Sequence, residues 1–121
     1  MIEPIPYFYD SINRNAIVVK PKQALCDWIN SVYPNDPVVT TDEGTIYLLK
    51  QKDNNVAIEK WLKNNFDNIF QNELNNWNTD EKEWPQKRTY KLFKEWFDIE
   101  IHSVILDMEE TIIIKTNHDN F

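Results

Sequence analysis

The stretch that decides the fold is IEKWLKNNFDNIFQNELNNW, residues Ile58–Trp77. Its apolar side chains recur at steps of three and four, which is typical of the buried face of an amphipathic helix. These side chains are Ile58, Trp61, Leu62, Phe66, Ile69, Phe70, Leu74 and Trp77. Asp53 or Asn54 can cap the helix by accepting a hydrogen bond from a free backbone N–H. We therefore predict a long helix from residue 53 or 54 to about 77, with this stripe against the core.

Two strands and a shorter helix are expected before this stretch. Residues 16–20 (AIVVK) form a short run rich in β-branched side chains, which favours a buried strand. Pro21 suits the first position of a helix, and the apolar spacing behind it predicts a helix over residues 21–33. Residues 34–44 are expected to be a loop, and residues 45–50 (TIYLLK) a second strand.

Beyond the long helix, the pattern predicts a polar break, a further helix and a strand. Residues 78–83 are polar, and Pro85 is expected to begin a helix that ends at Asp98. Residues 101–108 (IHSVILDM) are predicted to form a strand. Residues 111–115 (TIIIK) can add one more strand through a turn at residues 109–110, although neither glutamate favours a tight hairpin.

This order predicts an α+β fold, a two-layer sandwich with the order β-α-β-α-α-β(-β). Three helices should cover one face of a small mixed or antiparallel sheet, because a few short strands cannot bury themselves. If the first two strands are joined by a right-handed crossover, they should be parallel. We expect one domain over residues 1–121, with an extended arm at residues 1–14 and a flexible tail at residues 117–121.

Composition excludes several function classes. The single glycine, Gly44, cannot build a GxGxxG or P-loop phosphate site. The net charge of -7 argues against binding to nucleic acid, whose affinity comes mainly from lysine and arginine, and against anionic membranes. Cys26 is the single cysteine, so no intramolecular disulfide can form. Together with the absence of a secretory signal pattern, this predicts a cytoplasmic location.

The residues most suited to chemistry are His102, Glu100 and Asp107. Glu100 and His102 are two apart and should share one face of a strand. A carboxylate beside an imidazole can orient a general base or offer two metal ligands, which would suit a small hydrolase or metal-binding enzyme. Catalytic zinc usually takes three protein ligands, often histidines, and the chain has only two histidines. The sequence therefore favours no metal and no cofactor, and a non-enzymatic protein.

Trp77 and Trp84 flank the polar break and are the candidate partner-binding residues. Tryptophan is enriched at the energetic centres of protein interfaces. The alternative is that both close the ends of the helices over the core. We expect a small soluble domain that binds another protein, one with a basic face, through an acidic surface that carries aromatic side chains. An acidic decoy that blocks a nucleic-acid-binding protein is a further alternative.

Two segments carry a resemblance to known proteins. Residues 61–107 and VKPKQALCDWIN at residues 19–30 resemble a family of small single-domain bacterial proteins of uncharacterised function. The resemblance implies no activity, cofactor or catalytic residue.

Overall fold

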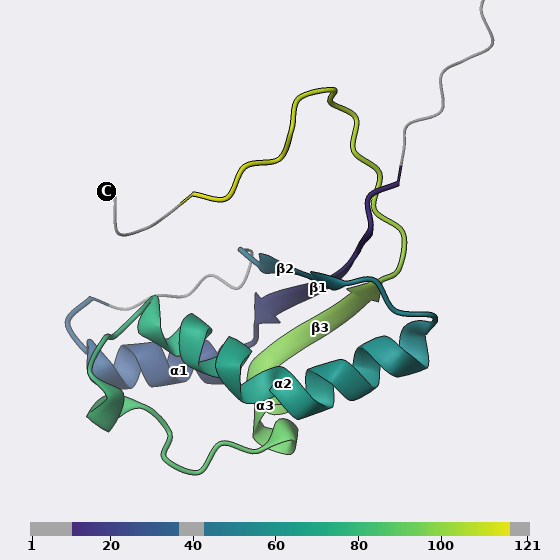
Figure 1. Cartoon of the computed structure of the whole chain (residues 1–121). Helices are drawn as coiled ribbons and strands as arrows, with labels where there is room; N and C mark the ends of the chain where they lie inside the picture. Colours follow the sequence, from purple (N-terminus) through teal and green to yellow (C-terminus); the bar gives the residue numbers. More distant parts are fainter. Residues whose placement is uncertain (1–10, 37–42, 117–121) are drawn as a thin grey trace, which may run out of the picture.

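The computed structural model describes residues 11–36 and 43–116, and it shows a small α+β fold. Three α-helices and three strands follow the order β1-α1-β2-α2-α3-β3, with a short 3-10 turn at Glu81–Glu83 before α3. The helices lie on one side of the sheet, and the segment after β3 arches over the other side (Figure 1). The predicted two-layer α+β arrangement is confirmed. Residues 1–10 of the expected arm and the expected tail at 117–121 lie outside the described residues, whereas Arg14, which was also assigned to the arm, begins a strand.

The sheet is antiparallel throughout, in the order β2-β1-β3. Its central strand β1 spans Arg14–Pro21, and its edge strands are β2 (Thr45–Lys50) and β3 (Phe97–His102). Of the two predicted alternatives, a mixed or an antiparallel sheet, the structure has the antiparallel one, and the first two strands are not joined by a crossover that makes them parallel. Thr45 lies opposite Val19, near the end of β1, so the chain re-enters the sheet at the end from which it left.

The helices form where the apolar spacing predicts them, with shifted ends. Helix α1 spans Gln23–Val32, because Pro21 still belongs to β1. Helix α2 spans Asn55–Asn75, and the Asn54 side chain caps it by accepting a hydrogen bond from the Ala57 N–H. Of the two caps that the sequence allowed, Asp53 and Asn54, the structure shows Asn54.

The region after α2 departs most from the prediction. Helix α3 spans only Tyr90–Trp96 and is capped by Thr89, so Pro85 does not begin a helix. Strand β3 starts directly after it, at Phe97, and ends at His102 rather than at residue 108. Residues 111–115 form no strand. Strand β3 ends at His102 because residues 97–102 form hydrogen-bonded pairs with β1. Among the described residues, the apolar segment that follows makes one isolated bridge, between Leu106 and Ser11.

The core lies between the sheet and the helices. Alternate residues of each strand face the helices, as the Ile17–Tyr47 and Ile17–Ile101 pairs show. Phe70 of α2 sits at the centre, fully buried, with its ring 5.5 Å from that of Phe97 and 5.7 Å from that of Phe93. The opposite face of the sheet carries Ile46 and Leu48, and none of the three described helices covers it (Figure 1).

Candidate functional site

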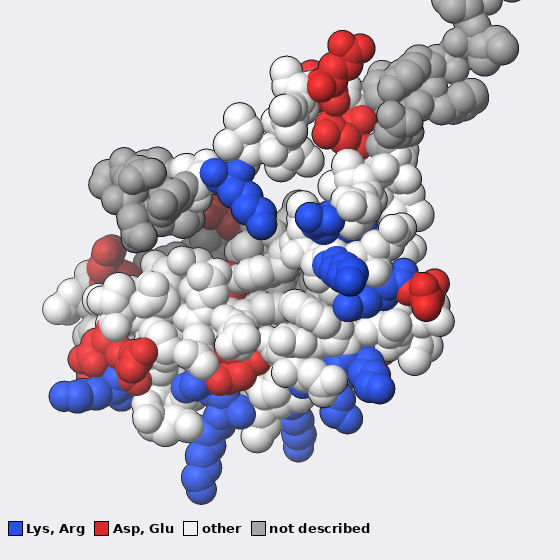
Figure 2. Space-filling model, viewed as in Figure 1, with Lys and Arg blue, Asp and Glu red and all other residues white. Residues whose placement is uncertain are grey.

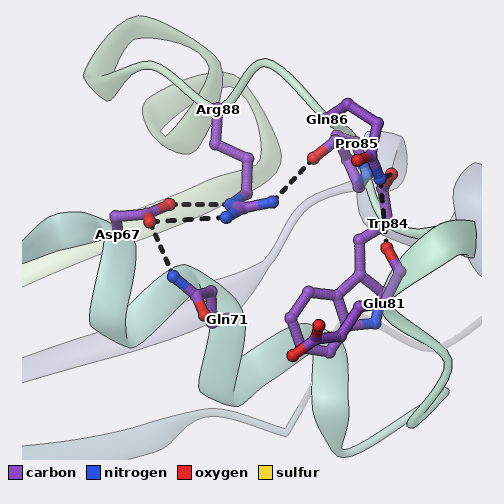
Figure 3. A network of polar contacts seen from close by, with 7 residues as sticks. All are labelled: Asp67, Gln71, Glu81, Trp84, Pro85, Gln86 and Arg88. Atoms are coloured by element: carbon purple, nitrogen blue, oxygen red, sulfur yellow. Dashed lines mark hydrogen bonds and ion pairs between the residues drawn. The ribbon is translucent and has the colours of Figure 1, made fainter.

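Trp84, one of the two candidate partner-binding residues, belongs to the core. Only 7% of it is exposed, and its indole N–H donates a 2.7 Å hydrogen bond to the Asn78 carbonyl oxygen. The Arg88 guanidinium lies 6.0 Å from the centre of its ring (Figure 3). Of the two interpretations made from the sequence, the structure supports the core role for this residue. Trp84 is not accessible as a surface anchor.

A polar network holds this segment against α2. Arg88 Nε donates a 2.7 Å hydrogen bond to Asp67 Oδ1, and another guanidinium nitrogen donates to the Pro85 carbonyl (Figure 3). The hydrogen bond from Arg88 holds the pKa of the Asp67 carboxyl below its usual range, with a further contribution from Gln71. The network is structural, because it joins residues that order the path from α2 to α3.

Trp77, the other candidate, lies at the surface. It is 40% exposed, and its carbonyl accepts a 3.0 Å hydrogen bond from the Tyr33 hydroxyl. It borders a shallow hollow of about 220 Å³ whose wall also includes Glu43, Thr45 and Glu73. An indole beside two carboxylates suits a cationic side chain. Trp77 therefore stays a candidate for partner binding.

Glu73 is a site residue that the sequence analysis missed. It is 6% exposed, and its carboxylate accepts a 2.5 Å hydrogen bond from the Tyr47 hydroxyl and one of 3.3 Å from Thr45. It forms no ion pair with any lysine or arginine that the structure describes. Burial, and then the hydrogen bond to Glu73, raise the pKa of Tyr47. The available signal was its spacing: Glu73 falls four residues after Ile69, on the apolar face of the predicted helix.

His102 and Glu100 are brought together, but at the surface. His102 Nε2 lies 3.4 Å from Glu100 Oε2, and the two side chains are 53% and 50% exposed. Asp107 does not complete the set: within residues 11–36 and 43–116, no three histidine, cysteine, aspartate or glutamate residues are placed to hold a metal ion. Asp107 instead accepts a hydrogen bond from the Glu109 N–H. For the enzyme hypothesis, the structure therefore provides a pair of residues, His102 and Glu100, that lies at the exposed surface and not in an enclosing cavity.

Cys26 is buried in α1, where it is 1% exposed. Burial raises the pKa of its thiol, and the neighbouring Asp27 carboxylate raises it further. Both effects disfavour the thiolate that a cysteine nucleophile requires.

The most prominent surface feature is apolar. We call residues 103–116 the C-terminal arm, and the sheet face opposite the helices, with Ile46 and Leu48, the open face. Ile46 is 65% and Leu48 48% exposed. Six apolar side chains of the arm are more than half exposed: Val104, Leu106, Met108, Ile112, Ile113 and Ile114. The arm and the open face enclose a hollow of about 690 Å³ between them, lined by Leu48, Arg14 and residues 107–113 among others.

Charges of opposite sign lie on the two sides of this hollow. The arm carries three acidic residues, Asp107, Glu109 and Glu110, and one basic residue farther along, Lys115, whereas the adjoining ends of β1 and β2 carry Arg14 and Lys50. Figure 2 shows acidic side chains on the arch of the arm and basic side chains gathered below it. The surface is therefore apolar in the middle with separate acidic and basic ends.

Comparisons with known proteins leave the family open. No protein-family model matches the chain, and no curated protein or solved structure is significantly similar to it. The resemblance to a bacterial family stays a prediction. Among the helices of the described residues, none is both long enough and apolar enough to span a membrane.

Proposed function

We propose that this protein is a protein-interaction domain whose binding surface is the open face together with the C-terminal arm. The observation that carries the proposal is that the exposed side chains of Ile112 and Ile113 line one hollow together with the exposed Leu48. Exposed apolar groups that are contiguous rather than scattered are typical of interaction sites. Each of these side chains would gain from burial against a partner, at roughly 25 cal/mol per Å² of apolar surface.

The charges on the surface specify the partner further. A partner that covers the arm must place basic side chains near Asp107, Glu109 and Glu110 and apolar side chains near the isoleucines. This supports the expectation of a partner with a basic face, although the anchors are aliphatic rather than aromatic. Trp77 and the adjoining carboxylates form a separate hollow, which is a second candidate position for a cationic side chain of a partner. The single cysteine supports action in a reducing compartment such as the cytoplasm.

Site-specific photocrosslinking in living cells tests the proposal. A photoreactive amino acid at Leu48 should give a discrete protein adduct, identified by mass spectrometry. The matched control is Val56 of α2, which is also apolar and exposed (78%) but lies outside the proposed surface. An adduct at Leu48 and not at Val56 supports the proposal. Equal labelling at both positions, or none at either, contradicts it.

Salt dependence provides a second measurement once the adduct is identified. Association between complementary charges is steered electrostatically, and salt screens this attraction over about 8 Å at physiological ionic strength. The association rate should therefore fall as salt rises. A rate that is independent of salt would contradict the role of the acidic arm.

A further inference from the structure

We infer that the C-terminal arm of one copy of this chain adds as a strand to the β2 edge of a second copy, so that the protein forms a reciprocal dimer. This inference rests on the proposed function, because it uses the same arm and open face, and it names a second copy as the partner.

The first half of the interface is the free edge of β2. In the order β2-β1-β3, β2 pairs with β1 alone among the described residues, so its other edge presents backbone N–H and C=O groups that no described strand pairs. Such an edge is a template for another strand. Ile46 and Leu48 stand exposed beside it on the open face.

The second half is the segment Thr111–Lys115 of the arm. Its threonine and three consecutive isoleucines are β-branched, a type that favours strands. Within the described part of the chain, no backbone hydrogen bond is made by residues 110–116. The segment therefore has the side chains of a strand without a partner strand. Its own β2 does not supply one, because the hollow of about 690 Å³ lies between the arm and Leu48.

Charge decides the direction of pairing. In an antiparallel arrangement, Glu110 lies opposite Lys50, at the end of β2, and Lys115 lies opposite Thr45, at its start. A parallel arrangement would place Lys115 near Lys50 and Glu110 near Glu43, which brings like charges together. Like charges directly opposite one another destabilise a strand pair, so the antiparallel direction is favoured.

The same register matches the apolar residues. With Glu110 opposite Lys50, Ile112 lies opposite Leu48 and Ile114 opposite Ile46. Directly opposed residues of antiparallel strands point to the same face of a sheet. Both pairs therefore fall on the open face, where aliphatic side chains bury one another.

The helix-facing side provides an independent observation. Lys115 falls opposite Thr45, whose hydroxyl lies 3.3 Å from Glu73 Oε1. Glu73 is a buried carboxylate without a cationic partner among the described residues. Buried charges are normally paired. The register chosen from Glu110 and Lys50 thus brings the Lys115 ammonium group to the position opposite Thr45, beside the Glu73 carboxylate.

A second copy fits this surface because each chain carries both halves. Two copies related by a twofold axis make the contact twice, which is the usual geometry of homodimers. The arm begins on its own body, where the Ile12 N–H donates a 2.9 Å hydrogen bond to the Ile105 carbonyl. The five residues from Leu106 to Glu110 then extend up to about 17 Å, enough to reach a neighbouring strand about 5 Å away.

Charge reversal tests the register. Sedimentation velocity at low salt should show a dimer for the wild-type chain. Lys50→Glu and Glu110→Lys should each raise the dimer dissociation constant at least roughly tenfold, since each creates two repulsive contacts per dimer. The double variant should recover most of the affinity. Lys60→Glu, on the exposed side of α2, is the matched control and should leave the constant unchanged. A monomeric wild type, or single variants without effect, overturns the inference.

Cysteine pairing tests the occupant directly. Copies with Leu48→Cys are mixed with copies with Ile112→Cys, and the bond is mapped by peptide mass spectrometry. A disulfide between positions 48 and 112 is expected, because opposed residues bring their Cβ atoms within disulfide reach. Val56→Cys mixed with Ile112→Cys is the control and should not pair. A chain with both Leu48→Cys and Ile112→Cys that closes only within a monomer would show that the arm pairs with its own β2, which overturns the second-copy inference.

The two proposals fail separately. A monomer that still gives a photoadduct with a different protein at Leu48 removes the dimer and retains the interaction domain. A monomer without any adduct at Leu48 contradicts both.

Discussion

Asn15 and Ser103 are 88 positions apart in the chain, yet the Asn15 side-chain amide donates a 3.0 Å hydrogen bond to the Ser103 carbonyl. The oxygen of the same amide accepts a 2.6 Å hydrogen bond from the Lys52 N–H. One side chain on β1 therefore fixes the chain just after both edge strands. Asn15 is 1% exposed, so these partners replace water for a fully buried amide.

Replacing Asn15 by Ala should lower the free energy of unfolding by roughly 2–4 kcal/mol, because the two backbone partners each lose a hydrogen bond. Urea denaturation measures the change. Asn15→Asp keeps the acceptor for Lys52 but places a buried carboxylate oxygen against the Ser103 carbonyl oxygen, so at pH 7 it should destabilise the fold at least as much as Asn15→Ala. A loss below about 0.5 kcal/mol for Asn15→Ala would show that the two strand ends are held by other means.

Replacing Phe70 by Ala should cost about 3–5 kcal/mol, the usual cost of emptying a buried aromatic site. Phe66 lies on the same helix but is only partly buried, so Phe66→Ala should cost less, roughly 1–2 kcal/mol. Thermal or urea unfolding of both variants checks the order, with the exposed Lys63→Ala as control. If Phe66→Ala costs more than Phe70→Ala, the orientation of α2 against the sheet is wrong.

Trp84→Ala should destabilise the fold by about 3–5 kcal/mol, because the indole is buried and its N–H is hydrogen-bonded. Trp77→Ala should change stability by roughly 1 kcal/mol or less, since Trp77 is largely at the surface. The two variants can be compared by their denaturation midpoints. A denaturation midpoint for Trp84→Ala equal to that of the wild type would contradict the core role of Trp84 and favour its role as a surface anchor.

Asp67→Asn should make stability less dependent on acid pH. Pairing with Arg88 depresses the pKa of Asp67 in the folded state, so its stabilisation is present above the unfolded pKa of about 3.9 and is lost as pH falls through the folded value. The Asp67 side chain is 42% exposed, which limits the loss at pH 7 to about 0.2–1 kcal/mol.

Unfolding measured between pH 7 and pH 2 provides the check for Asp67. The difference between wild type and Asp67→Asn should shrink below about pH 4 and vanish at the acid end. Lys63→Ala, an exposed substitution on α2 that removes no carboxylate, is the control. A difference that stays constant over the whole range would mean that the Asp67 charge does not contribute.

Local pattern was sufficient for the parts of the fold that depend on one segment. The spacing of Ile58, Leu62, Ile69 and Phe70 predicted α2 and its buried face, because helical hydrogen bonds join residues four apart and side-chain direction follows from position alone. The cap at Asn54 is local for the same reason. The net charge of -7 likewise follows from the sequence alone.

Tertiary structure decided the strands and the surface. Residues 97–102 and 111–115 both carry strand-forming side chains, but only the former pair with β1, because a strand exists only where a second strand satisfies its backbone. The same dependence buried Trp84, placed the Glu73 carboxylate beside Tyr47 and left the isoleucines of the arm exposed. The spacing of residues along the chain determined which segments could form a helix or a strand. Pairing and packing with residues far away in the sequence determined which of these segments did so.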